Sequence, residues 1–205
     1  GLTTPETLHA ALSGGAAFVG AVLFPKSPRH IDPLHAATLF ERARGRAGIV
    51  AVTVDADDTL LTEIGLILKP DLIQLHGRET PERAVEVRRL TGAGIIKALP
   101  VSTPFDLDAA ADWEDVTDHL MFDARPPEGS ALPGGVGASF DWSMMWGQTY
   151  RKPWFLAGGL TPENAARAAA ISGAPMLDVS SGVESAPGVK DSARIAAFLD
   201  AVRTV

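Results

Sequence analysis

Short apolar runs recur along this sequence at a nearly even spacing, and this rhythm constrains the fold more than any other feature. The runs begin near residues 18, 48, 72, 94, 120, 154 and 176. They therefore return about every 25 to 30 residues, the length of one strand-helix unit in a (β/α)8 barrel. The run Phe18–Leu23 is continuous rather than alternating, which is typical of a strand buried on both faces of a parallel sheet. The sequence predicts an α/β protein.

Helix-start signals lie between these runs. Thr4-Pro5, Thr80-Pro81 and Thr103-Pro104 each join a residue type that caps helices to a proline suited to the first helical position. We expect helices to begin near residues 5, 33, 58, 81, 104, 142, 162 and 192. Residues 124–139, rich in Pro and Gly, are expected to form a long loop, and such loops are usually functional.

Seven strands and eight helices are thus expected, and the chain opens with a helix. A barrel sheet that lacks one strand exposes two edges, which is an aggregation hazard. We therefore expect a (β/α)8 TIM barrel whose first β-strand precedes Gly1 and is missing from the given sequence. A doubly wound open sheet is the alternative. No linker or low-complexity segment interrupts the pattern, so residues 1–205 are expected to form a single TIM-barrel domain.

Composition excludes several classes of function. The net charge of −7 argues against a nucleic-acid surface. No apolar run approaches the roughly 20 residues needed to cross a bilayer. The sequence has no cysteine, which excludes disulfides and thiolate metal sites and fits a cytoplasmic protein. The histidines at 9, 30, 35, 76 and 119 show no metal-ligand spacing. We expect no metal, no nucleic-acid partner and no membrane association.

The last two strands both end in small residues that leave backbone amides accessible. Gly158 and Gly159 follow one run, and Ser180, Ser181 and Gly182 follow the next. Glycine lets a ligand approach the backbone closely, and N–H groups at helix starts attract anions. Two such turns in succession predict a phosphate site at these five residues, although each turn alone would be an ordinary β-to-α connection.

The first of these turns carries its own helix-start signal. Thr161 is expected to be the N-cap, Pro162 the first helical residue, and Asn164 part of the first turn.

Polar side chains follow several strands, and in a barrel these positions meet at one mouth. Asp123 could act as a general acid or base, or it could be a loop carboxylate. Arg29 could hold a substrate carboxylate with two parallel hydrogen bonds, or be solvated. Asp178 could bind a sugar hydroxyl or brace the adjacent loop. His76 sits between constrained neighbours, which favours a structural role. The residues alone indicate a barrel enzyme acting on a small phosphorylated anion.

Taken together, several segments resemble the phosphoribosylanthranilate isomerase family. They span nearly the whole chain in the family's order. The segments are Gly1-Leu-Thr3, Phe24-Pro-Lys-Ser-Pro-Arg29, Asp71-Leu-Ile-Gln-Leu-His-Gly77, Ile96-Lys-Ala98, Phe122-Asp-Ala124, Leu132-Pro-Gly-Gly-Val-Gly137, Phe140-Asp-Trp142, Leu156-Ala-Gly-Gly-Leu-Thr-Pro-Glu-Asn164, Asp178-Val-Ser-Ser-Gly-Val-Glu-Ser185 and Pro187-Gly-Val-Lys-Asp191.

The resemblance implies a cofactor-free Amadori rearrangement in tryptophan biosynthesis. It implies that Asp123 is the general acid on the ribose ring oxygen and that Arg29 lies near the anthranilate. His76 and Asp178 complete the expected substrate-binding set, and the two glycine loops bind the phosphate. The family's general base is a cysteine at the position just before Gly1, so this base is absent from the given sequence.

Other functions remain open at this point. Indole-glycerol-phosphate synthase, another phosphate-binding barrel, would use a Lys–Glu pair, and Lys97 ends a strand here. A non-catalytic sugar-phosphate-binding scaffold would also fit the absent base. An enzyme that also isomerises the histidine-pathway analogue is disfavoured because the first half of the chain lacks a matching Gly-Gly loop. The expected partner is a small phosphorylated substrate, bound by a monomer or a homodimer.

Overall fold

A computed structural model describes residues 1–130, 132–135 and 137–203. In these residues a parallel sheet of seven strands runs in chain order from β1 to β7. The strands are β1 (Phe18–Val22), β2 (Gly48–Thr53), β3 (Leu72–Leu75), β4 (Gly94–Val101), β5 (His119–Ala124), β6 (Trp154–Leu156) and β7 (Met176–Leu177).

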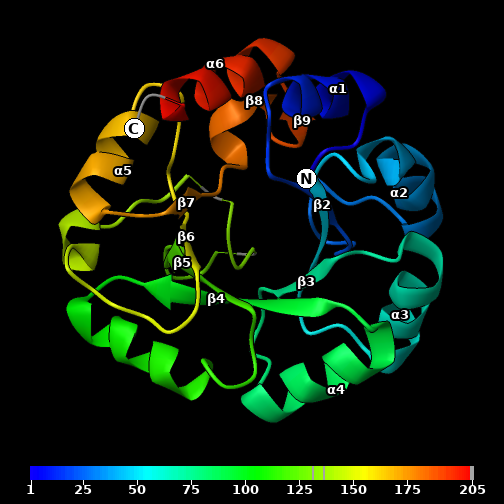
Figure 1. Cartoon of the computed structure of the whole chain (residues 1–205), viewed down its shortest axis with the longest axis horizontal. Helices are drawn as coiled ribbons and strands as arrows, with labels where there is room; N and C mark the ends of the chain where they lie inside the picture. The colour runs from blue at the N-terminus through cyan, green and yellow to red at the C-terminus, as the bar shows by residue number, and fades with distance from the viewer. Residues whose placement is uncertain (131, 136, 204–205) are drawn as a thin grey trace.

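Helices follow the strands and surround the sheet. Figure 1 shows the sheet curled around a centre, with the helices on the outside. The helical elements are α1 (Pro5–Ser13), α2 (Pro33–Phe40), η1 (Glu41–Ala43), α3 (Asp58–Glu63), η2 (Ile64–Leu68), α4 (Pro81–Thr91), η3 (Pro104–Asp112), η4 (Trp142–Met145), α5 (Ala165–Ser172), η5 (Ser181–Val183) and α6 (Ser192–Val202).

This arrangement confirms the predicted barrel class. The doubly wound alternative is wrong, because it would place helices on both faces of an open sheet, whereas here they lie on the outer face of a curled one (Figure 1). Among the described residues, β1 pairs with β2 and β7 pairs with β6, and no pairing joins β1 to β7. The sheet is therefore a (β/α)8-type barrel that lacks one strand.

The chain begins beside this unpaired edge. The N–H groups of Gly1 and Leu2 both donate to the carbonyl of Gly20 in β1, at 2.7 and 3.0 Å. Figure 1 shows the N-terminus inside the ring of helices.

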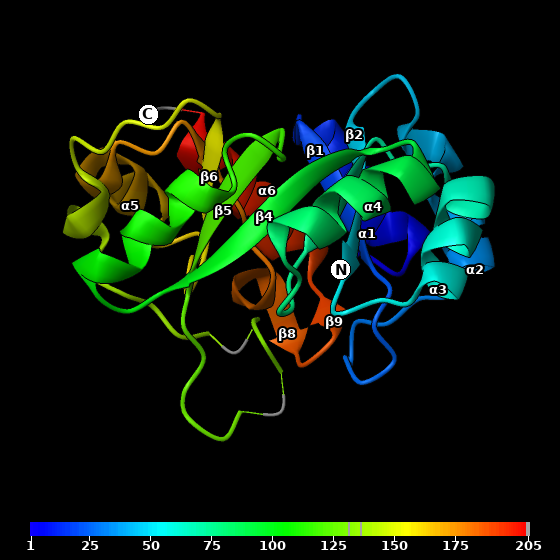
Figure 2. The same cartoon turned by 90° about the horizontal axis from the view of Figure 1, so that it is seen from below.

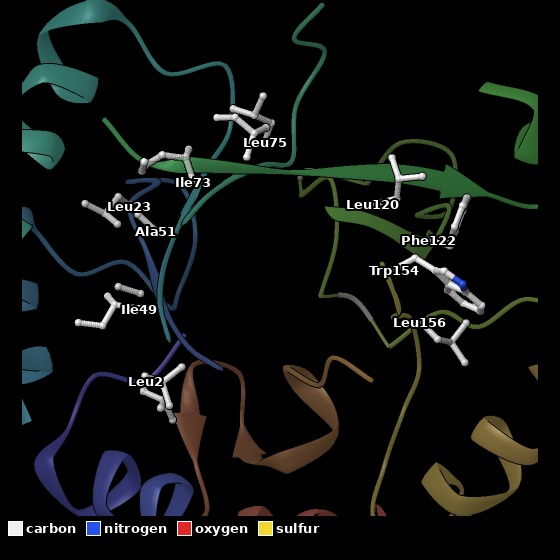
Figure 3. Close-up of a cluster of buried hydrophobic side chains, with 14 of the residues drawn as sticks. Leu2, Leu23, Ile49, Ala51, Ile73, Leu75, Leu120, Phe122, Trp154 and Leu156 are labelled. Atoms are coloured by element: carbon white, nitrogen blue, oxygen red, sulfur yellow. The ribbon is translucent and has the colours of Figure 1, made fainter. Parts of the chain in front are cut away.

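Strand residues alternate between two apolar layers. The outer layer lies between sheet and helices and includes Leu23, Ile49, Ile73 and Phe122 (Figure 3). A smaller inner layer lies on the barrel axis and is formed by Val50, Leu72, Ile96, Ala98, Met121, Phe155 and Ala157. The central strands β3, β5 and β6 are buried on both faces, as continuous apolar runs predict. In β1 buried and half-buried residues alternate, and both residues of β7 are half-buried, because these two strands border the unpaired edge.

Several predicted elements differ in detail. The segment from Pro104 to Asp112 is a 3-10 helix rather than an α-helix, and α3 continues as a π-helix over Ile64–Leu68. A two-stranded antiparallel hairpin, β8 (Glu184–Ala186) and β9 (Val189–Lys190), was not predicted. No helix in the described part of the chain is long and apolar enough to cross a membrane.

Candidate active site

A cavity of about 770 Å³ extends from the carboxyl ends of the strands into the gap between β1 and β7. Figure 2 shows the loop after β1, the long loop after β5 and the β8–β9 hairpin projecting from the same side of the barrel. Four of the predicted site residues line the cavity, namely Arg29, His76, Asp123 and Asp178. The cavity also reaches Gly158, Gly159, Ser180 and Ser181, whereas Gly182 is outside its lining.

Asp123 belongs to β5 and is only 8% exposed. His76 Nε2 lies 3.2 Å from Asp123 Oδ2. The side-chain amide of Gln74 is 2.8 Å from His76 Nδ1. An amide nitrogen can only donate, so Nδ1 accepts from Gln74, and Nε2 is the ring nitrogen that faces Asp123. His76 thus lies between Gln74 and Asp123 in the cavity wall.

Asp178 faces the same cavity from the end of β7. Burial raises its pKa above the ordinary value, and the charge of Asp123 raises it further. A second negative charge is unfavourable in a poorly hydrated site beside the Asp123 carboxyl, which is why the pKa of Asp178 is raised. The two acids thus form an unequal pair.

Arg29 lies in the loop after β1 and is 5% exposed. Its Nε and Nη2 donate to the two carboxylate oxygens of Glu184, at 2.7 and 2.9 Å. Nη2 also donates to the carbonyl of Gly135, at 3.0 Å. The face of the guanidinium that we expected to pair with a substrate is therefore already paired with Glu184.

The two glycine turns lie against each other. Gly158 and Gly159 adopt positive φ values of 88° and 67°, which disfavour any residue with a Cβ. A Cβ at Gly158 would stand 2.5 Å from the backbone nitrogen of Ala124, and one at Gly182 would stand 1.8 Å from the carbonyl oxygen of Leu160. Only glycine permits this contact between the turns.

The predicted helix start after Gly159 is wrong. Helix α5 begins at Ala165, and Asn164 rather than Thr161 is its N-cap. The Asn164 side chain accepts from the N–H of Thr161 at 2.7 Å and donates to the carbonyl of Gly159 at 2.9 Å. These bonds close a turn over residues 161–164, so Pro162 precedes the helix.

The second turn departs from the expectation in a related way. It leads into η5, a 3-10 helix of three residues, which is too short to add a useful helix dipole.

Sequence reasoning gave no role to two further charged residues: Lys190, which lines the cavity, and Glu184, which pairs with Arg29. Glu184 and Lys190 face each other across the β8–β9 hairpin, and their side chains are 5% and 3% exposed. The signal that could have found them is the Pro187-Gly188 pair, which indicates a tight turn between two short strands.

Comparison with known proteins identifies the family. A family model described as N-(5'-phosphoribosyl)anthranilate (PRA) isomerase matches residues 1–201. The chain belongs to this family.

A curated isomerase of this name from Caulobacter sp. (strain K31) is 55% identical over 206 residues, covering 100% of this chain and 97% of the relative. The crystal structure of the phosphoribosyl anthranilate isomerase from Thermotoga maritima matches with a TM-score of 0.85 and 30% identity, covering 100% of this chain and 96% of that one. A phosphoribosyl anthranilate isomerase in complex with reduced 1-(o-carboxyphenylamino)-1-deoxyribulose 5-phosphate matches with a TM-score of 0.83 and 27% identity, at the same coverage.

PRA isomerase is an enzyme of tryptophan biosynthesis. It isomerises N-(5'-phosphoribosyl)anthranilate to 1-(2-carboxyphenylamino)-1-deoxyribulose 5-phosphate, and this is the activity of the present chain. The identification excludes the synthase and scaffold alternatives. The substrate is a small molecule with a phosphate at one end and an aromatic carboxylate at the other, and the site must accommodate both anions.

Proposed function

We propose that this chain carries out the isomerisation at the cavity described above, with Asp123 as the general acid. The observation that carries the assignment is the position of Asp123 at the end of β5, nearly buried and beside the glycine turns. His76 occupies Oδ2, so Oδ1 is the oxygen that gives its proton to the ribose ring oxygen. Protonation there opens the ring and leaves a Schiff base.

The glycine turns bind the phosphate. Their contact brings the backbone amides near Gly159 and Ser181 to one corner of the cavity. Several N–H donors around one phosphate supply charge-assisted hydrogen bonds without a metal ion. Asp178, which directly follows β7 and lines the cavity, hydrogen-bonds the sugar hydroxyls. Arg29 stands at the other end of the cavity and attracts the anthranilate carboxylate.

The second step removes the proton from C2 of the sugar and needs a base on the other side of the substrate. The family pattern places a cysteine immediately before Gly1. Gly1 lines the cavity, so the preceding position lies close to it. We assign the C2 base to that position.

The direct test follows the fluorescence of the anthranilate substrate as it is converted. Two chains are compared, both extended before Gly1 by a strand-length segment, one ending in Cys and the other in Ala. Turnover by the Cys chain alone supports the assignment of the base. Equal turnover by both chains would reject it.

The general acid is tested in the Cys-extended chain. Asp123→Asn is expected to lower kcat by roughly 10² to 10⁴, because an amide cannot deliver the proton. Binding of the reduced product analogue should persist, which separates lost chemistry from lost folding. Turnover close to that of the parent chain would remove Asp123 from the mechanism.

We place this chemistry in the cytoplasm, in a single-domain monomer or homodimer. The absence of cysteine from the sequence fits a reducing compartment. Light scattering of the purified protein would decide between monomer and dimer.

A further inference from the structure

The β8–β9 hairpin connects the two anion-binding ends of the cavity. It follows the second glycine turn directly, and its tip packs on the loop that carries Arg29. A Cβ at Gly188, in the turn between the strands, would stand 2.5 Å from the carbonyl oxygen of Pro28. The hairpin therefore lies against the loop after β1 with no space between the two backbones.

Glu184 holds the guanidinium of Arg29 in one orientation. The paired bonds to Nε and Nη2, together with the bond from Nη2 to Gly135, leave Nη1 without a hydrogen-bond partner among the residues that the structure describes. Both side chains are almost fully buried, at 6% and 5% exposure. Nη1 is therefore the guanidinium nitrogen that is available to a ligand.

Lys190 holds the turn at Ser180, at the phosphate end of the cavity. Its Nζ donates to the carbonyl oxygen and the hydroxyl of Ser180, at 2.8 and 3.1 Å. It also donates to Glu184 Oε1 at 2.6 Å. One carboxylate thus joins the cation that faces the aromatic end to the cation that holds the phosphate turn.

This carboxylate is ionised over the whole working range of pH. Burial opposes its charge, but the hydrogen bonds from Arg29 and Lys190 lower the pKa of Glu184 to about 2. A charged, buried carboxylate with two cationic partners has a fixed geometry, because any displacement would leave a buried charge unpaired.

We propose that Glu184 and Lys190 are positioning residues of the isomerase. Glu184 directs Nη1 of Arg29 toward the substrate's aromatic carboxylate, and Lys190 fixes the Ser180 turn against its phosphate. The inference rests on the proposed role of Arg29 and extends it, since it names the residues that set the distance between the two anion sites.

The test measures binding by calorimetry, so it does not depend on turnover. The probes are the reduced product analogue, the same analogue without its ring carboxylate, and inorganic phosphate. The variants are Glu184→Gln, Glu184→Asp, Lys190→Met and Arg29→Met. Glu79→Gln is the matched control, because Glu79 and Lys97 form an equally buried ion pair, at 2.8 Å with 4% exposure each, and Glu79 does not line the cavity.

Glu184→Gln should reduce the preference for the carboxylated analogue by about tenfold, the loss expected when one charge-assisted hydrogen bond is misaligned. Glu184→Asp, which keeps the charge on a shorter stem, should recover part of that preference. Lys190→Met should weaken the binding of inorganic phosphate by a similar factor. Glu79→Gln should lower the melting temperature but change neither the preference for the carboxylated analogue nor the affinity for inorganic phosphate.

The outcomes distinguish the proposed role of Arg29 from the positioning roles of Glu184 and Lys190. If Arg29→Met leaves the preference unchanged, the proposed role of Arg29 is wrong. If Arg29→Met abolishes the preference while both Glu184 variants retain it and lose only stability, Arg29 stands and Glu184 is merely structural. If Lys190→Met binds phosphate normally, Lys190 does not position the turn.

Discussion

Asp123 and Asp178 show how the cavity makes two identical side chains unlike. Asp123 has His76 Nε2 at 3.2 Å from its Oδ2. Asp178 is held toward its neutral form by burial and by the charge of Asp123. A site that handles both a ring oxygen and sugar hydroxyls benefits from such a difference, because one group can exchange a proton while the other only donates a hydrogen bond.

The raised pKa of Asp178 has a consequence for stability. Between the ordinary value of 3.8 and the higher folded value, the folded chain keeps a proton that the unfolded chain releases. The free energy of unfolding therefore falls as pH rises through this window. Asp178→Asn cannot ionise, so its stability relative to the parent should increase with pH there.

Urea unfolding at a series of pH values measures this difference. Asp112→Asn, a change at an exposed residue of η3, serves as the control. A stability difference between Asp178→Asn and the parent that stays constant or decreases with rising pH would contradict the prediction.

At the scale of elements, the glycine turns depend on close backbone approach as well as on φ. Gly159 and Gly92 share nearly the same φ, 67° and 70°. A Cβ at Gly159 would meet the carbonyl oxygen of Ala138 at 2.9 Å, whereas one at Gly92 would meet nothing within 4 Å. The two positions therefore separate backbone strain from steric exclusion.

Gly92→Ala should cost about 1 kcal/mol of stability from the strained φ alone. Gly159→Ala should cost a further 1 to 3 kcal/mol of stability, roughly the penalty for inserting a methyl group into a packed site. It should also weaken the binding of inorganic phosphate. Denaturant unfolding and calorimetry measure the two effects. Equal losses in the two variants would show that the approach of residues 138 and 139 is unimportant.

At the scale of the whole molecule, β1 and β7 are not paired with each other in the part of the chain that the structure describes. Edge strands leave unpaired N–H and carbonyl groups, and the cavity extends between them, lined by Phe18, Gly20 and Met176. A parallel strand inserted there would pair on both sides and bury these surfaces.

A segment of about five apolar residues, the usual length of a strand, fused before Gly1 should therefore raise the melting temperature. The bonds from Gly1 and Leu2 to Gly20 already direct the chain along β1. A fusion of equal length with two prolines should give no such increase, because proline cannot donate to the ladder. An equal shift with both segments would indicate only non-specific burial.

Much of the fold follows from local signals in the sequence. Thr4 and Thr80 cap their helices through side-chain bonds, as the Thr-Pro pairs predicted. The continuous apolar runs became strands, and those in the middle of the sheet are buried on both faces, since apolar side chains on both sides of a strand leave it no solvated face. These signals involve neighbours a few residues apart, so a single sequence contains them.

The order of the elements also determined that Arg29, His76, Asp123 and Asp178 would meet, because parallel strands carry their following residues to one mouth. Only the tertiary structure decided how these residues are paired. Glu184 lies 155 positions from Arg29 in sequence, and its hairpin closes through contacts with a distant loop. The helix after Gly159 starts late for a similar reason, since two bonds of Asn164 outweigh the capping preference of Thr161. Such choices depend on long-range contacts, whose energies no local pattern records.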